Sequence, residues 1–262
     1  MNKIAIYTAI FGENQVLYPQ PPIQGFDFIC FSDKAHQTPG WKVILVEKPY
    51  ENDSVRSNRY YKILPHLFLK EYEYSIYMDG NFIILKSPLP LIVSEMQDSN
   101  MLVFDHNQTA KDLRNCVYKE GNAIVDLYQK KGVLKDDLAL IETQLNVYKS
   151  KGYPQNRGLI KGGVLIRKHN EPDVVQTMER WWYFVERYSK RDQLSFNYAA
   201  WETNLNFKFL PGDIRRGNPW FYMVSKADQN LSFSLLKYKW RNSIGGFFDS
   251  AIKLLKRTFR FS

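Results

Sequence analysis

The sequence predicts an α/β domain with a mixed, mostly parallel central sheet flanked by helices. Three short apolar segments, residues 3–10, 26–31 and 41–46, have the composition of strands, and each runs into a polar loop. Helical patterns follow from residue 55 onward. Such an order of strands joined by helical segments is typical of a sheet covered by helices.

A fourth strand is expected in residues 75–85, where Asp79-Gly80-Asn81 interrupts an apolar run. Ligands of open α/β sheets collect at the carboxyl ends of strands. The Asp79 carboxylate and the Asn81 carbonyl are oxygen ligands one residue apart, and they suit Mg²⁺ or Mn²⁺. Such an ion suits a substrate that carries phosphate. A plain Asp-Gly turn explains the same residues without any ligand.

The segment before this strand reads as a helix over residues 55–64, with Ser54 as its N-cap. Arg56, Arg59 and Lys62 recur every three residues and therefore share one face. A cationic face directly upstream of Asp79 is what a diphosphate site would need. A solvated basic helix surface is the alternative.

The rest of the chain continues with helices and strands in turn. We expect a helix near residues 87–93, a strand at 101–104, mostly helix from 110 to 149 with a break near 132, a strand within 158–167, helices at 172–188 and 192–201, and a last strand at 206–210. Gly162 and Gly163, at the start of their strand, permit either the close approach of a ligand or a bulge. Asp192 is a candidate N-cap.

Composition excludes several classes of protein. The 262 residues are 44% hydrophobic and 24% charged, which indicates a soluble globular protein. Cys30 and Cys116 are too few for a disulfide scaffold, so we expect buried thiols in a cytoplasmic protein. Residues 4–11 read as a core strand rather than a signal peptide. No apolar stretch reaches the length of roughly 18 residues that spans a bilayer.

The net charge of +9 is concentrated in the tail, where residues 237–262 hold seven basic residues against Asp249. We therefore divide the chain into a domain, 1–225, and a basic tail, 226–262, and expect no nucleic-acid partner. Residues 244–259 have the pattern of a basic amphipathic helix that would bind an anionic membrane surface. This would make the protein peripheral on the inner face of the membrane. Docking of the helix on the domain is the alternative.

Seven separated motifs occur in one order along residues 3–225. They are Tyr7-Thr-Ala-Ile-Phe-Gly12, Phe28-Ile-Cys-Phe-Ser-Asp33, Arg56-Ser-Asn-Arg-Tyr-Tyr-Lys62, Tyr77-Met-Asp-Gly-Asn81, His106 with Arg114-Asn-Cys-Val-Tyr-Lys-Glu120, Gly162-Gly-Val-Leu-Ile-Arg-Lys-His169, and Arg191-Asp-Gln-Leu-Ser-Phe196. Together they resemble a glycosyltransferase-like family, long a domain of unknown function, found in bacterial surface-polysaccharide loci and plant cell-wall proteins.

Residues 61–85 are more distantly similar to the family 8 glycosyltransferases. This resemblance implies a GT-A fold, the fold of nucleotide-diphospho-sugar transferases, and a divalent ion on the donor diphosphate. The sequence departs from that pattern in two places. Asn81 stands where the second carboxylate of the metal motif is expected, and no histidine follows His169.

The resemblance implies a metal-assisted enzyme that moves a sugar from a nucleotide-sugar donor to a glycan or lipid-linked glycan in capsule or O-antigen synthesis. A metal at Asp79 would stabilise charge on the leaving diphosphate. The residues expected to bind the nucleotide sugar are Thr8, Ala9, Phe11, Gly12, Asp33, Arg56, Arg59, Lys62, Asp79, Gly162 and Gly163.

Asp192 and Gln193 are the main candidates for catalysis or sugar contact, and Asp192 could act as general base in an inverting enzyme. His106 and Glu120 are further catalytic candidates. Two other functions remain open. One is a sugar-phosphate or nucleotidyl transferase, and the other is a non-catalytic glycan- or membrane-binding module on a degenerate scaffold.

Overall fold

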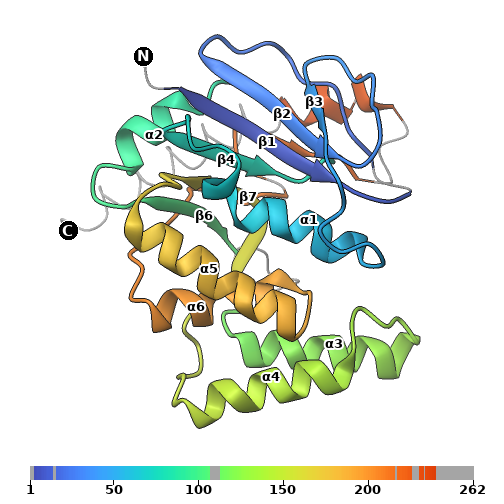
Figure 1. The fold of residues 1–262 in the computed structure, drawn as a ribbon, viewed down its shortest axis with the longest axis vertical. Coiled ribbons are helices and arrows are strands. Elements are labelled where there is room, and N and C mark those ends of the chain that lie inside the picture. The colour runs from blue at the N-terminus through green and yellow to red at the C-terminus, as the bar shows by residue number, and fades with distance from the viewer. Residues whose placement is uncertain are drawn as a thin grey trace, which may run out of the picture.

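A seven-stranded sheet runs through the centre of the computed structural model, in the order β3-β2-β1-β4-β7-β6-β8 (Figure 1). The structure describes residues 3–13, 16–106, 113–215, 217–225, 230–232 and 234–239, so the expected amphipathic helix at 244–259 lies outside the described residues. The strands of the sheet are β1 (Ile4–Ile10), β2 (Phe26–Ser32), β3 (Lys42–Leu45), β4 (Tyr74–Met78), β6 (Met101–Asp105), β7 (Ile160–Arg167) and β8 (Lys208–Phe209).

The sheet is mostly parallel, as the sequence predicts. β1 pairs in parallel with β2 and β4, β2 with β3, and β6 with β8, whereas β7 runs antiparallel to both β4 and β6. This reversal places the start of β7 beside the carboxyl ends of β4 and β6. The backbone N–H of Asp79 accordingly donates to the carbonyl of Gly163 at 3.0 Å.

Helices cover the sheet, and two further helices lie beyond it at one end of the molecule. They are α1 (Ser54–Ile63), α2 (Leu89–Glu95), α3 (Val117–Lys131), α4 (Leu138–Ser150), α5 (Pro172–Arg187) and α6 (Phe196–Glu202), with short 3₁₀ turns η1 (Pro65–Leu67) and η2 (Asp192–Leu194). The α3–α4 pair lies at the end of the molecule remote from β1, β2 and β3 (Figure 1). None of the helices that the structure describes is long and apolar enough to cross a bilayer.

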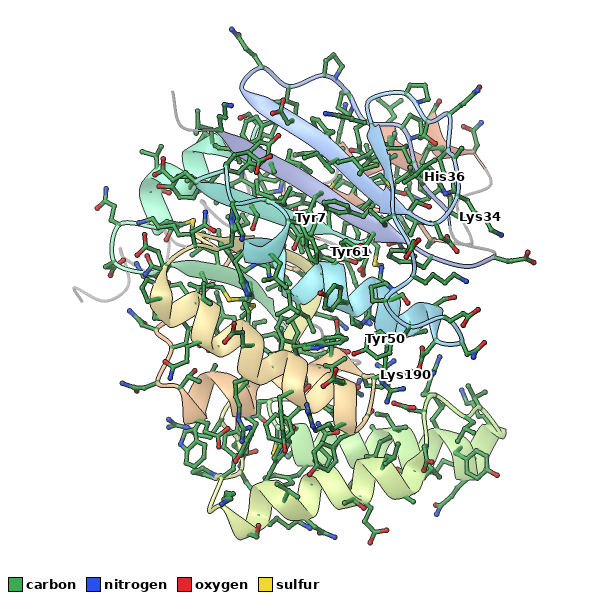
Figure 2. The ribbon with its side chains drawn as sticks, in the orientation of Figure 1. Tyr7, Lys34, His36, Tyr50, Tyr61 and Lys190 are labelled. Carbon is green, nitrogen blue, oxygen red and sulfur yellow. The ribbon has the colours of Figure 1, made fainter. Side chains whose placement is uncertain are left out.

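Alternation along β1 divides the core between the two faces of the sheet. Tyr7 packs with residues of α1 and α5 on one face, while Ile6 packs with Ile92 of α2 on the other. Tyr7 and Tyr61 lie between the sheet and α1 (Figure 2). The mixed α/β architecture with helices on both faces of a mostly parallel sheet is therefore confirmed.

The C-terminal end of α1 is held by a buried arginine. Arg167, fully buried on β7, donates to the Lys62 carbonyl at 2.9 Å and to the Tyr7 hydroxyl at 2.5 Å. The Tyr7 hydroxyl in turn donates to the same carbonyl at 2.8 Å. A cation beside the last carbonyls of a helix is favourable to its dipole. These contacts set where the side chains of the last turn of α1 lie.

Several local expectations are corrected. The N-cap of α1 is Asp53 rather than Ser54, because the Asp53 carboxylate accepts from the N–H groups of Val55 and Arg56. Asp192 does not cap a continuous helix: η2 and α6 are separate, and the Asp192 carboxylate accepts from the N–H of Gln193. The strand expected at 206–210 shrinks to the two residues of β8, and a later strand, β9 (Phe221–Met223), follows it.

A second, two-stranded sheet pairs β5 (Phe82–Ile84) with β9 (Phe221–Met223). Tyr238, which the sequence assigns to the tail, is buried and packs against Tyr222 of β9. Its hydroxyl donates to the Asn218 carbonyl at 3.0 Å. The described part of the tail thus contacts the domain, and membrane binding by residues 244–259 stays a prediction.

The turn after β4 requires glycine at position 80. A Cβ atom there would lie 2.5 Å from the Val16 carbonyl oxygen and 2.6 Å from the Ile10 side chain. The Gly80 carbonyl also accepts from the Tyr18 N–H at 3.2 Å. The Asp79-Gly80-Asn81 turn is therefore packed closely against the loop that precedes β2.

We predict that Gly80→Ala lowers the free energy of unfolding by about 1–3 kcal/mol, because backbone must shift to admit the methyl group. Gly217→Ala is the matched control, since a Cβ there meets no atom within 4 Å. Thermal unfolding should show a midpoint several degrees lower for the first variant alone. Equal midpoints for both variants would contradict the close packing of this turn.

Candidate functional site

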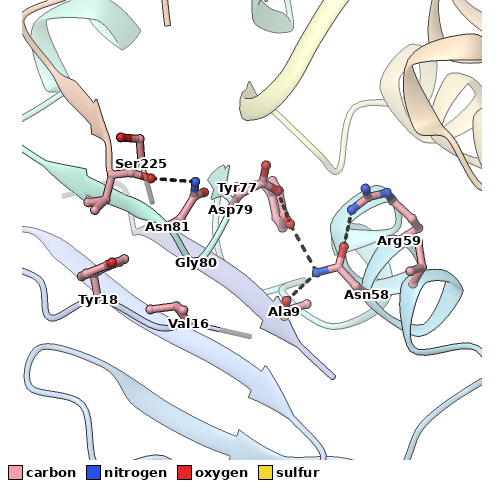
Figure 3. A pocket seen from close by; sticks show the side chains of 12 residues that line it. Ala9, Val16, Tyr18, Asn58, Arg59, Tyr77, Asp79, Gly80, Asn81 and Ser225 are labelled. Atoms are coloured by element: carbon pink, nitrogen blue, oxygen red, sulfur yellow. Dashed lines mark hydrogen bonds between the residues drawn. The ribbon is translucent and has the colours of Figure 1, made fainter. Parts of the chain in front are cut away.

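Two neighbouring pockets lie at the carboxyl edge of the parallel strands. The larger, of about 430 Å³, is bordered by Ala9 on β1, Asn58 on α1, and Asp79 and Asn81 after β4 (Figure 3). The smaller, of about 200 Å³, lies among Lys62, Gly162, Asp192 and other residues. Arg59 and Asp79 border both pockets. The two cavities therefore meet at one cation and one carboxylate.

A buried ion cluster lies in the smaller pocket. The Lys62 ammonium, 2% exposed, is 2.5 Å from Asp192 Oδ2, and Arg59 Nε is 3.3 Å from the same oxygen. Burial by itself would raise the pKa of Asp192, but Arg59 and Lys62 outweigh it and hold the pKa well below its usual range. The carboxylate is therefore ionised at neutral pH, and α1 and η2 are joined by opposite charges.

The pKa of Lys62 is lowered, because its burial outweighs the attraction of Asp192 and Asp79. Asp79 Oδ1 lies 3.9 Å from the Lys62 ammonium and accepts from the Tyr77 hydroxyl at 2.9 Å. The same ammonium lies over the Tyr77 ring, 4.9 Å from its centroid. The side chains of Lys62, Asp192, Asp79 and Tyr77 are therefore linked by close polar contacts.

Arg59 is positioned by Asn58, whose role the sequence analysis did not foresee. The Asn58 carbonyl accepts from Arg59 at 2.5 Å, and its amide donates to the Ala9 carbonyl (Figure 3). Tyr77 was also missed, although it stands two residues before Asp79 and points toward the same side of the sheet. Side chains two residues apart on a strand point to the same face, so alternation along β4 indicates that Tyr77 lies on the side of Asp79. No comparable signal in the sequence identifies Asn58.

Gly162 and Gly163 lie at an irregularity of β7, beside the buried ion pair. A Cβ at Gly162 would lie 3.2 Å from the Lys62 ammonium and 3.3 Å from Asp192 Oδ2, so glycine leaves room for the ion pair. The pairing of β6 with β7 also shifts between Val103 and Phe104, which marks an irregularity at this point. The expected bulge is therefore present, and the close approach of a ligand stays a prediction.

The side chains expected to bind a divalent metal offer few ligand atoms. Asp79 offers one carboxylate, and Asn81 donates its amide N–H to the Val224 carbonyl at 3.2 Å, which leaves its own carbonyl as an acceptor. No group of three His, Cys, Asp or Glu side chains suited to a metal occurs in the described parts of the chain. One carboxylate and one carbonyl fit an ion such as Mg²⁺ that is held chiefly by substrate phosphates.

The further catalytic candidates, His106 and Glu120, line neither pocket. Both are buried, and Arg114 connects them through contacts of 3.4 Å to His106 and 2.6 Å to Glu120. Glu120 also lies 3.6 Å from Arg191, which borders the smaller pocket. Arg114 and Arg191 therefore connect both residues to the edge of the smaller pocket.

Several other residues expected to bind the nucleotide sugar make contacts away from both pockets. Arg56 pairs with Asp53 at 2.7 Å and donates to carbonyls of residues 185 and 188, tying α1 to the end of α5. Tyr50 and Lys190 lie in this same region (Figure 2). Asp33 accepts weakly from the Gly12 N–H and pairs with Lys48 at 3.3 Å. The residues of this group outside both pocket linings are Thr8, Phe11, Gly12, Asp33 and Arg56.

The arrangement is suited to an anion that spans the two pockets. Arg59 offers a planar guanidinium that can bind phosphate in a bidentate manner, and Lys62 adds a second positive charge. Asp192 and Gln193 border the smaller pocket from the opposite element. Gln193 is held in place by its amide, which donates to the Ile160 carbonyl at 2.8 Å.

Comparison with known proteins supports a family assignment. The glycosyltransferase-like domain family TOD1/MUCI70 matches residues 30–211. An Arabidopsis thaliana protein described as "Probable hexosyltransferase MUCI70" is 27% identical over 165 residues, covering 60% of this chain. The matched region spans only 27% of that plant protein.

A solved structure titled "WbbM bifunctional glycosytransferase apo structure" superposes with a TM-score of 0.44 at 8% identity, covering 82% of this chain and 39% of the other. The family match spans more than half of the chain and includes Arg59, Lys62, Asp79 and Asp192. The chain therefore belongs to the TOD1/MUCI70 glycosyltransferase-like domain family.

Proposed function

We propose that this domain is a glycosyltransferase that moves a hexosyl unit from a nucleoside-diphosphate sugar to a glycan hydroxyl. The observation that carries the proposal is the pair of pockets that meet at Arg59 and Asp79, with Lys62 buried beneath them. The name of the plant relative supports the choice of a hexose. A growing surface polysaccharide is the acceptor class that the family resemblance favours.

In this proposal the nucleoside occupies the larger pocket and the sugar the smaller one. The diphosphate then lies at their junction, where Arg59 and Lys62 can contact its oxygens. Breaking the bond between the sugar and the diphosphate leaves growing negative charge on the leaving oxygen. Positive groups already fixed in place stabilise that charge without reorganising during the reaction.

A divalent ion held by Asp79 and the Asn81 carbonyl would add further positive charge to the diphosphate. The protein supplies few ligands, so we propose that the ion arrives with the nucleotide rather than occupying a tight site of its own. Asp79 also lies 3.9 Å from Lys62, so the ion and the ammonium would share its charge.

Asp192 is proposed to bind and orient the sugar instead of accepting the acceptor's proton. Its pKa is depressed because Arg59 and Lys62 stabilise the carboxylate against the cost of burial, and a weakly basic carboxylate is a poor general base. It can accept hydrogen bonds from sugar hydroxyls and favour positive charge on the reacting carbon. Gln193 offers an amide beside it.

We predict that Arg59→Gln weakens binding of a nucleoside diphosphate by about ten- to hundredfold, the loss expected for a charged hydrogen bond. Calorimetry with UDP, GDP, CDP and dTDP measures the affinity, and release of nucleoside diphosphate from the matching sugar donors measures the reaction. Arg56→Gln is the control on the same helix: it should lower thermal stability and leave affinity unchanged. Binding of no nucleotide, or equal losses in both variants, would count against the proposal.

A second prediction concerns the metal. Mn²⁺ should increase nucleotide affinity in the wild type, and Asp79→Asn should abolish that increase. Asn81→Asp should enlarge it, because a second carboxylate adds charge to the ligand set. Asp126→Asn, which alters an exposed carboxylate on α3, is the control. An Mn²⁺ effect that survives Asp79→Asn would remove Asp79 from the metal site.

A third prediction concerns acid stability. Because the folded-state pKa of Asp192 is depressed, its carboxylate stabilises the fold above the ordinary Asp pKa of about 3.9 and loses this contribution as the pH falls below that value. Asp192→Asn leaves Lys62 buried without its close partner and should cost about 3–5 kcal/mol at pH 7. The difference between variant and wild type, measured by urea unfolding, should shrink on acidification. A difference independent of pH would contradict the ionised pair.

A further inference from the structure

A third cavity, of about 410 Å³, lies among residues 156–158, α6 and the segment that leads into β8. Its lining includes the aromatic side chains of Trp201, Phe207 and Phe209 and the side chains of Asn156 and Asn204. Phe209, on the short strand β8, is 43% exposed although its ring is apolar. The cavity therefore combines accessible aromatic surface with amide groups.

The two asparagines have special backbone conformations. Asn156 and Asn204 are the non-glycine residues with positive φ, 59° and 58°, among the residues that the structure describes. Their side-chain amides make no hydrogen bond with other described residues. Each amide has both donors and an acceptor available for a ligand.

We propose that this cavity is a carbohydrate-binding subsite that holds the acceptor glycan away from the reaction centre. Aromatic rings pack against the C–H faces of sugar rings, and asparagine amides can donate to and accept from sugar hydroxyls. The aromatic rings thus suit the C–H face of a sugar, and the amides suit its hydroxyl groups. This inference rests on the proposed glycosyl transfer for its role in catalysis, but carbohydrate binding itself can be measured alone.

The cavity is joined to the reaction centre through one residue of β7. The Ile160 N–H donates at 3.1 Å to the side-chain oxygen Oδ1 of Asn197, which borders the cavity. The backbone carbonyl of Ile160 accepts at 2.8 Å from the side-chain amide of Gln193, which borders the smaller pocket. Gly158 borders the cavity and Gly162 the smaller pocket. They are four residues apart in the chain, a separation of at most about 13 Å, which a short oligosaccharide can span.

The first test measures binding of short hexose and pentose oligosaccharides on an immobilised array, without donor. Phe209→Ala should weaken retention of the bound oligosaccharide by about tenfold, the equivalent of one lost aromatic contact. The Asn156→Gly, Asn204→Gly double variant should weaken it similarly, because glycine keeps the backbone conformation and removes the amides. Tyr128→Ala, an aromatic residue of α3 that is 44% exposed, is the matched control and should bind as the wild type does.

The second test separates this subsite from the reaction. Phe209→Ala should raise KM for an oligosaccharide acceptor about tenfold while leaving kcat and nucleotide affinity unchanged. Oligosaccharide binding that is lost in Phe209→Ala, in a protein that shows no transfer, would support the subsite and refute the proposed function. Retention of no oligosaccharide by the wild type, or equal retention by the wild type and both cavity variants, would overturn the subsite.

Discussion

The buried contact between Lys62 and Asp192 is the constraint on which the site depends. A charge removed from water costs several kcal/mol unless a partner and hydrogen bonds compensate it. Lys62 is 2% exposed, and its close partner comes from 130 residues later in the chain. The loop after α5 must therefore bring η2 against α1, and glycine at position 162 leaves room where the two charges meet. Replacing the pair by apolar groups could keep the fold, but it would remove the charges that the proposed chemistry uses.

That pair is placed by a second buried cation. Arg167 holds the Lys62 carbonyl from β7, and Tyr7 of β1 holds the same carbonyl, so the end of α1 is tied to two strands of the sheet. Burial lowers the pKa of Arg167 more than its contact with Tyr7 raises it, and burial raises the pKa of Tyr7 to about 12. Tyr7 therefore stays protonated and donates to the carbonyl. The backbone of Lys62 is thus fixed independently of its ammonium group.

The sequence predicts the sheet, its helices and the Asp79 turn well because each has a local signal: an apolar run, a helical period or an Asp-Gly pair. It does not predict the reversal of β7, since a buried strand has the same composition in either direction. Because Arg56, Arg59 and Lys62 are equally spaced on α1, the sequence likewise cannot show that Arg59 faces the pockets and Arg56 does not. Arg56 binds Asp53 and backbone carbonyls near the end of α5, whereas Arg59 faces both pockets. That difference arises from how α5 packs on α1, which is a tertiary contact.

The same limit applies to Asp192, for which we propose a role other than that of general base. As a residue in a sequence motif it is an acid that could serve as a base, but its contacts with Lys62 and Arg59 stabilise the ionised form. A bound diphosphate would compete for these two cations and would thereby loosen their hold on the carboxylate. The freedom of Asp192 to contact the sugar would then depend on whether the donor is present. In the proposed function, the anionic donor itself would thus free the carboxylate that orients its sugar.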